Sequence, residues 1–85
     1  MYKISYSNQA SKFLSNTDKF ITKRITAKIE SLRIKPIIPD TKTIQGYQEK
    51  IFRIRVGDYR ILYEIDYEIN QIGIIKIDKR SRVYS

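Results

Sequence analysis

The chain has 85 residues, a length that bounds it to one small domain with a simple core. Its 17 Lys and Arg residues against nine Asp and Glu residues give a formal net charge of +8, which favours a polyanionic partner, first nucleic acid and second an acidic protein. The absence of Cys and His excludes disulfides, thiolate chemistry, structural zinc sites and imidazole acid/base catalysis, and no cofactor is expected.

The first part of the chain predicts one strand followed by two helices. Residues 2–6 alternate apolar and polar side chains, which indicates a short strand and carries no apolar run of signal-peptide length. Ser7 is positioned to cap a helix through about Ser15, and residues 16–18 supply turn and cap chemistry for a second helix. The buried stripes of the two helices are predicted to hold Ala10, Phe13 and Leu14, then Ile21, Ile25, Ile29 and Leu32. Because no segment approaches the roughly 20 apolar residues of a membrane span, we expect one cytoplasmic domain over residues 1–85.

The second part of the chain predicts a long connection and a meander of three strands. Residues 34–49 contain both prolines and lack clear periodicity, which favours a loop. Strand patterns follow over residues 50–56, 59–66 and 72–78. The last of these is rich in isoleucine, which indicates a central strand covered on at least one face. The predicted class is α+β, with two N-terminal helices packed on an antiparallel sheet in the order β-α-α-β-β-β.

Three arginines mark the first hairpin of this meander. If Gly57 and Asp58 form a two-residue turn, Arg55 lies opposite Arg60, and Arg53 lies opposite Leu62. Like charges at opposed positions destabilise a sheet by roughly 0.2–1 kcal/mol, so the fold gains nothing from this pair. An anion bound from outside would compensate the repulsion between the two arginines.

A second basic cluster follows the last strand. Lys76, Lys79, Arg80 and Arg82 fall within seven residues, and they would form a phosphate-binding face if they converged with the arginines of the hairpin. Aromatic residues near these cations could stack on exposed bases, and Tyr47, Tyr59 and Tyr84 are the candidates. Tyr59 and Tyr63 share the parity of Ile61 and Ile65, which favours a place in the core. The cations of the second helix are read as a solvated face, with contact to ribosomal RNA as the minority hypothesis.

The order of elements, with R-I-R-V-G-D-Y-R-I-L-Y in the meander and K-R-S-R-V-Y at the end, resembles the RelE/ParE superfamily of bacterial and archaeal toxins. The resemblance covers nearly the whole chain. It implies a type II toxin that enters the ribosomal A site and cuts mRNA as a metal-independent endoribonuclease, until a cognate RelB-like antitoxin sequesters it. The site residues implied are Arg53, Arg55, Arg60, Lys79, Arg80 and Tyr84, with Lys50, Lys76, Arg82 and Tyr47 as further contacts to RNA.

The sequence departs from the best-known RelE pattern at two places. The basic pair of the second strand is arginine here in place of lysine, and Asp78 and Lys79 precede the final arginine where glycine with histidine or lysine is usual. Metal-free RNA cleavage needs a base for the 2′-OH, cations for the phosphorane and an acid for the leaving 5′-oxygen. Arginine suits the second role, and Lys79 is the better candidate base because neighbouring arginines disfavour its charged form, with Tyr84 next.

Two other functions stay open at this point. ParE-type members share the fold, lack the nuclease residues and inhibit DNA gyrase by protein contact. An inactive toxin relic or a simple RNA-binding module is the third possibility. The presence of Arg60, Arg80 and Tyr84 favours the nuclease.

Overall fold

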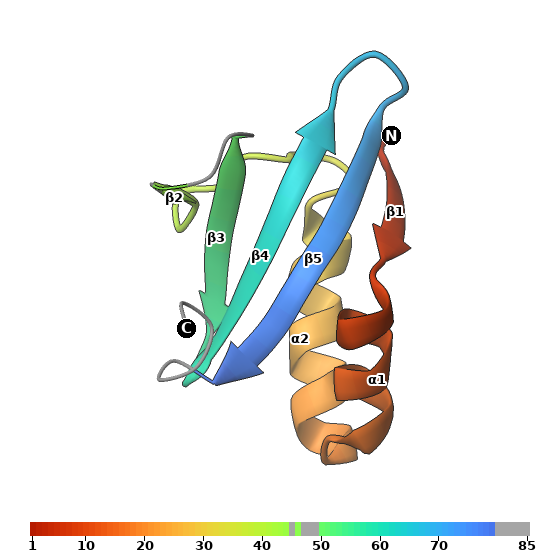
Figure 1. The fold of residues 1–85 in the computed structure, drawn as a ribbon, viewed down its shortest axis with the longest axis vertical. Helices are drawn as coiled ribbons and strands as arrows, with labels where there is room; N and C mark the ends of the chain where they lie inside the picture. Colours follow the sequence, from red (N-terminus) through yellow and green to blue (C-terminus); the bar gives the residue numbers. More distant parts are fainter. Residues whose placement is uncertain (45, 47–49, 80–85) are drawn as a thin grey trace.

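A computed structural model describes residues 1–44, 46 and 50–79, and it contains two helices and a five-stranded sheet (Figure 1). The elements are β1 (Lys3–Tyr6), α1 (Asn8–Asn16), α2 (Lys19–Ser31), β2 (Lys42–Ile44), β3 (Ile51–Val56), β4 (Tyr59–Asp66) and β5 (Gln71–Lys79). The strand order is β1-β5-β4-β3-β2, so β5 lies inside the sheet as predicted. The predicted α+β class is confirmed. Neither helix in the described part of the chain is long and apolar enough to cross a membrane.

The sheet differs from the predicted antiparallel meander in two details. β1 pairs with β5 in parallel, because the two helices return the chain to the end of the sheet from which β1 started. β2 lies within residues 34–49, where a loop was expected, and pairs antiparallel with the start of β3. Its three residues are too few for a period-2 pattern to show in the sequence.

Both helices begin at the capping residues that the sequence indicated. The Ser7 hydroxyl accepts a hydrogen bond from the Ala10 amide at 3.1 Å and donates to the Ile75 carbonyl of β5 at 2.6 Å. The Asp18 carboxylate accepts from the Phe20 amide at 2.8 Å, which satisfies one of the free N–H groups of the first turn of α2. Ser7 therefore caps α1 and ties it to the sheet at the same time.

The core lies between the helices and one face of the sheet. Ala10, Ile25, Ile29 and Leu32 are fully buried, whereas Phe13, Leu14 and Ile21 are partly buried against the same cluster. The predicted stripes are thus confirmed. The prediction that Tyr59 and Tyr63 belong to the core is also confirmed, since Tyr63 is fully buried and the Tyr59 ring contacts the Phe13 ring edge-on at 5.7 Å.

The buried Tyr63 side chain also holds the connection between α2 and β2. Its hydroxyl donates to the Pro36 carbonyl at 2.6 Å and lies 3.1 Å from the Thr41 hydroxyl. Burial raises the pKa of the Tyr63 hydroxyl above its ordinary value, so the group stays a neutral donor. The segment from Pro36 to Thr41 is therefore fixed against β4 by a side chain of the core.

Beyond the end of β1, the side chain of Gln9 on α1 forms hydrogen bonds with the exposed edge of β5. β1 pairs with β5 only as far as Ile74. Further along, the Gln9 amide donates to the Ile77 carbonyl at 2.7 Å and accepts from the Ile77 amide at 2.9 Å. Gln9 thus takes the place of a neighbouring strand, and it fixes the last residues of β5, which lead into the predicted basic cluster.

Candidate nucleic-acid interface

The hairpin between β3 and β4 has the register that the sequence predicted. Arg55 pairs with Arg60, and Arg53 pairs with Leu62. Gly57 has a φ of 57°, a left-handed conformation that glycine adopts without the strain a side chain would bring. The turn chemistry of Gly57 therefore sets two arginines directly opposite each other.

A β-bulge decides which side chains of β5 join these arginines. The register shifts between Leu62 and Tyr63, so that Leu62 pairs with Lys76 while Tyr63 pairs with Ile74. Ile75 is the extra residue. The bulge keeps Ile77 in the core and turns Lys76 and Asp78 to the face of the sheet that the helices leave open.

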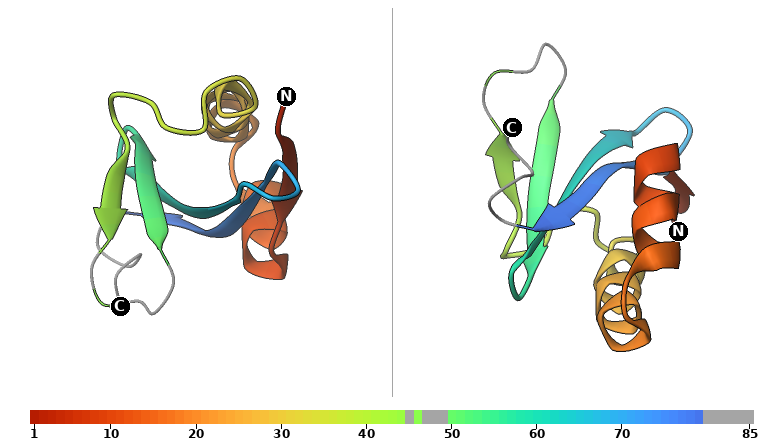
Figure 2. Two further views of the ribbon diagram at one scale, coloured as in Figure 1. Left: turned by 90° about the horizontal axis from the view of Figure 1, so that it is seen from above. Right: turned by 60° about the horizontal axis from the view of Figure 1, so that its bottom comes forward.

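The open face therefore carries two rows of side chains across neighbouring strands. One row runs from Lys42 on β2 through Arg53 and Leu62 to Lys76. The next row, closer to the turn, runs from Arg55 through Arg60 to Asp78. β2 and β3 are strongly rotated relative to β4 and β5, and this twist curves the open face of the sheet (Figure 2). The predicted convergence of the hairpin arginines with Lys76 has a geometric basis in this register.

Arg60 is the charged residue of this face that lies deepest. It is only 5% exposed, and its Nη1 donates to the carbonyl oxygens of Gly57 and Tyr59, both at 3.4 Å. These distances exceed the usual 2.7–3.2 Å of N–H···O bonds, so both bonds are weak. The guanidinium is held in place by the turn and can exchange weak acceptors for the charged oxygens of a phosphate.

Arg55 lies in a different environment from the other two arginines of the hairpin. Its amide donates to Asp40 Oδ2 at 3.1 Å, and its Nε lies 3.7 Å from Asp40 Oδ1. Lys28 of α2 reaches the same carboxylate at 3.6 Å. Burial opposes ionisation of Asp40, but the amide of Arg55 and the charges of Lys28 and Arg55 outweigh it and hold the pKa of this carboxyl below its ordinary value. Arg55 is thereby drawn toward α2.

Lys79, the predicted base, lies on the face of the sheet that packs against the helices, because side chains alternate between the two faces along β5. It pairs with Tyr59 and shares the parity of Ile77, both of which contact the core. Asp78 has the parity of the open face and pairs with Arg60. The sequence analysis noted Asp78 only as a departure from the RelE pattern. The signal that could have placed it on this face is the pair Ile74 and Ile75, which breaks the alternation of the strand.

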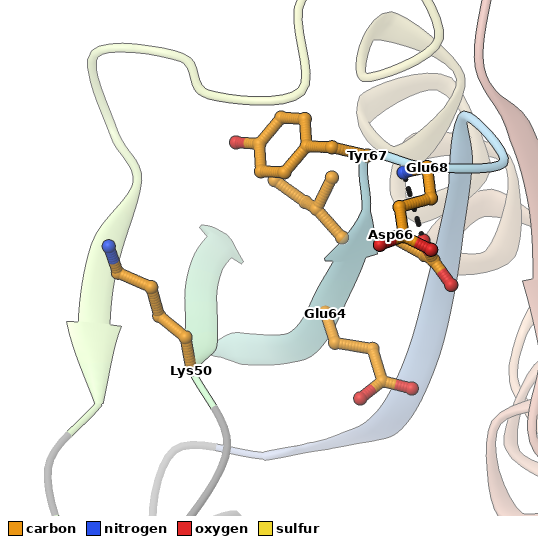
Figure 3. Close-up of a pocket in the computed structure, with 6 residues that line it drawn as sticks. Lys50, Glu64, Asp66, Tyr67 and Glu68 are labelled. Carbon is orange, nitrogen blue, oxygen red and sulfur yellow. Dashed lines mark hydrogen bonds between the residues drawn. The ribbon is translucent and has the colours of Figure 1, made fainter.

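Lys50 lies at the opposite end of the face from the hairpin turn. It borders a hollow of about 690 Å³ together with Glu64, Asp66, Tyr67 and Glu68 (Figure 3). Its Nζ also lies 5.9 Å from the centre of the Phe52 ring. The carboxylates of this hollow repel phosphate, so the surroundings of Lys50 do not support its predicted role in binding RNA.

The remaining predicted site residues lie outside the described residues. They are Tyr47, Arg80, Arg82 and Tyr84. Their predicted roles stay predictions. The described part of the site consists of the open sheet face with Arg53, Arg60, Lys76 and Asp78, and of Arg55 at its border.

Comparison with known proteins agrees with this architecture. The chain matches the family described as the ParE toxin of the type II toxin-antitoxin system parDE over residues 4–84. A comparison with curated proteins found no matching sequence.

Solved structures of toxins share the fold over almost the whole chain. The archaeal RelE-RelB complex from Pyrococcus horikoshii OT3 is 26% identical with a TM-score of 0.80, covering 96% of this chain and 98% of that one. The RelB-RelE complex from Methanococcus jannaschii is 28% identical with a TM-score of 0.71, covering 94% of each chain. The isolated E. coli RelE toxin is similar in fold, at 22% identity and a TM-score of 0.79, covering 99% of this chain and 92% of that one. With the family match over residues 4–84, these findings show that the chain belongs to the ParE toxin family of type II toxin-antitoxin systems, within the RelE/ParE superfamily.

Proposed function

We propose that this toxin is a ribosome-dependent endoribonuclease that cleaves mRNA in the A site and so inhibits translation. The observation that carries the proposal is the register of the open face, which sets Arg53, Arg60 and Lys76 on three adjacent strands. The like charges of these three side chains repel one another in the absence of an anion. A phosphate group seated between them would offset that repulsion.

The proposed chemistry assigns the arginines to the phosphate. Arg60 is almost fully buried beside the turn, and Arg53 has its Nε and Nη2 atoms buried, so packing restricts both guanidiniums before a ligand arrives. Fixed cations stabilise the extra negative charge of the phosphorane without reorganisation. Arg55 contributes from the border of the face, where Asp40 already orients it.

The proton transfers are proposed for the end of β5 and the residues after it. Lys79 or Tyr84 would accept the proton of the 2′-OH, and Arg80 would stabilise the transition state or assist the leaving 5′-oxygen. Asp78 enters as a third candidate base, because it shares the open face with Arg60. A carboxylate within reach of the 2′-OH can act as a general base.

The test is cleavage of mRNA on programmed 70S ribosomes, mapped by primer extension. Wild-type protein should give cuts at codon-defined positions. Arg60→Met keeps much of the buried volume and removes the charge, and it should lower the rate of cleavage by about 100-fold, the scale of one lost electrostatic stabiliser. Lys12→Met, at an exposed position of α1, is the matched control and should cleave as wild type does.

Comparison of three substitutions, at the end of β5 and in the residues after it, assigns the base. Asp78→Asn, Lys79→Met and Tyr84→Phe each remove one candidate. The base is the residue whose loss abolishes the rise of the cleavage rate with pH, since the other variants keep the titrating group. Retention of that rise in all three variants would refute the assignment to this segment.

Inhibition of DNA gyrase is the second candidate function, and the match to the ParE toxin family over residues 4–84 favours it. A toxin of that kind would leave mRNA intact on programmed ribosomes and would block supercoiling by gyrase. An inactive relic would do neither. Running both assays on one preparation therefore separates the three possibilities.

The proposed partner is an acidic antitoxin encoded beside the toxin. The RelE toxins from Pyrococcus horikoshii and Methanococcus jannaschii were solved as complexes with RelB. The net charge of +8 favours a partner of opposite charge that covers the basic face. Growth arrest on expression of the toxin, relieved by the neighbouring gene, is the expected result.

A further inference from the structure

An exposed apolar patch lies at the end of the molecule away from the β3–β4 hairpin turn. Six large hydrophobic side chains are exposed in the described part of the chain, and four of them belong to this end. They are Met1, Ile34, Tyr67 and Ile69, each between 60% and 88% exposed, and we call them the end patch. Figure 1 shows the N-terminus beside the β4–β5 turn at this end, whereas the β3–β4 turn lies at the opposite end.

Contacts between three segments of the chain hold the end patch together. The Tyr2 amide donates to the Arg33 carbonyl at 2.9 Å, and Arg33 Nη1 donates to the Tyr2 carbonyl at 3.2 Å. The Lys3 amide donates to the Asn70 carbonyl at 2.9 Å, and the Tyr2 ring contacts the Tyr67 ring edge-on at 6.4 Å. Each member of the end patch makes one of these contacts or is next in sequence to a residue that does. The four side chains therefore start from backbone segments that are fixed side by side.

Charges of opposite sign flank the end patch on two sides. Asp66 and Glu68 are exposed on the side of β4, where the Glu68 amide donates to Asp66 Oδ1 at 3.0 Å. Two exposed lysines lie on the side of β1: Lys3 in that strand, and Lys35, two residues after the Arg33 that contacts its start. The strand order β1-β5-β4 sets β5 between the two groups. The end of the molecule thus has an apolar centre, an acidic side and a basic side.

This distribution fits a second copy of the chain better than a partner of one charge sign. An acidic partner would be repelled by Asp66 and Glu68, and a basic partner by Lys3 and Lys35. A second copy related by a two-fold axis sets its acidic side on the basic side of the first copy and its basic side on the acidic one. The two apolar centres then meet at the axis and cover each other, as an exposed patch of this kind requires.

We propose that two copies of the toxin associate end to end through the end patch and form a symmetric dimer. The inference goes beyond the proposed nuclease activity and does not depend on it. Arg60 and Asp66 lie at opposite ends of β4, so the dimer leaves the Arg60 end of both open faces accessible. A patch of four side chains belongs to the weak class of interfaces, which bury less than about 1,200 Å² in total, and we expect a dissociation constant on the order of 100 µM.

The test is sedimentation equilibrium of the full-length toxin from about 5 to about 500 µM, a range that brackets the expected dissociation constant. The wild-type protein should pass from monomer to dimer over this range. Ile69→Ser removes an exposed apolar side chain from both copies and should weaken the dimer by about tenfold or more. Phe20→Ser, at the start of α2, removes another exposed hydrophobic side chain outside the end patch and should keep the wild-type constant. Circular dichroism checks that both variants fold.

Charge reversal tests the two-fold arrangement itself. Glu68→Lys and Lys3→Glu each set like charges opposite one another across the dimer, and each should weaken it by about threefold or more. Net charge alone makes the opposite prediction for Lys3→Glu, which lowers the positive charge of each copy by two units and would strengthen association. The double variant Lys3→Glu/Glu68→Lys exchanges the two sides and should return to the wild-type constant.

Four outcomes decide the question. A wild-type toxin that stays monomeric over the whole range would overturn the proposal. Equal weakening by Ile69→Ser and Phe20→Ser would also overturn it, because the end patch would then have no special part in association. A monomeric toxin whose binding to the antitoxin falls in Ile69→Ser would assign the end patch to the antitoxin instead. A dimeric wild-type protein that leaves mRNA intact on programmed ribosomes would refute the proposed nuclease activity and leave the dimer supported.

Discussion

Gln9 provides the sharpest test of how the helices position the end of β5. Its side chain makes two hydrogen bonds with Ile77, at 2.7 Å and 2.9 Å, across 68 residues of sequence. Gln9→Ala leaves the amide and the carbonyl of Ile77 without these partners. Each hydrogen bond contributes about 0.5–1.5 kcal/mol net, so the loss of two should lower the free energy of unfolding by about 1–3 kcal/mol. For a domain of this size that loss lowers Tm by about 4–24 °C.

Thermal and urea unfolding of two variants at neighbouring positions measure this effect. Asn8→Ala, in the same turn of α1, is the matched control and should change the stability by less than about 0.5 kcal/mol, as exposed substitutions usually do. Gln9→Glu keeps the acceptor for the Ile77 amide but sets a carboxylate against the Ile77 carbonyl. Its deficit relative to wild type should therefore shrink as the pH falls and the carboxyl becomes a donor. A free energy of unfolding for Gln9→Ala within about 0.5 kcal/mol of that for Asn8→Ala would refute the reasoning.

Three further predictions concern the hairpin and the connection before β2. Asp40→Asn should be less stable than wild type by up to about 1 kcal/mol near pH 7. Because the folded state lowers the pKa of Asp40, this difference should be fully present above the ordinary pKa of the carboxyl and should vanish as the pH falls through the lower pKa of the folded state. Urea unfolding at several pH values measures it. Tyr63→Phe, measured in the same way, should cost about 1–3 kcal/mol because it leaves the carbonyl of Pro36 without its donor. Gly57→Val should lower both Tm and the rate of mRNA cleavage, since valine is strained at a φ of 57° and would displace Arg60.

The hairpin could be predicted from the sequence because its rules are local. Gly57 and Asp58 define a two-residue turn, and a two-residue turn fixes which residues pair on the flanking strands. Counting outward from this turn pairs Arg55 with Arg60, as the structure shows. The buried stripe of α2 was predictable for the same reason, because spacings of three and four residues place side chains on one face of a helix.

The side chains that meet across the fold could not be predicted in this way. The sequence does not show that Asp40, in a connection without periodicity, reaches both Lys28 and Arg55. The bulge at Ile75 reverses the parity of the last residues of β5, so a count made along an unbroken strand assigns Lys79 and Asp78 to the wrong faces. In the structure Asp78 lies with Arg60 on the open face, and Lys79 lies with Tyr59.

The order of charges along β4 predicts that an anion would bind only the half of the open face nearest the turn. The residues of β4 that share this face are Arg60, Leu62, Glu64 and Asp66, so the charge changes from positive to negative on either side of the buried Leu62. Gly73 lets the Glu64 side chain lie close over β5, where an added Cβ would be 3.3 Å from Glu64 Oε1. A carboxylate repels a phosphate charge 4 Å away by about 1 kcal/mol even in water, and by more where the protein excludes water. A phosphate on this face is therefore attracted at the end near Arg60 and repelled at the end near Glu64, which confines it to the neighbourhood of the residues proposed to cleave RNA.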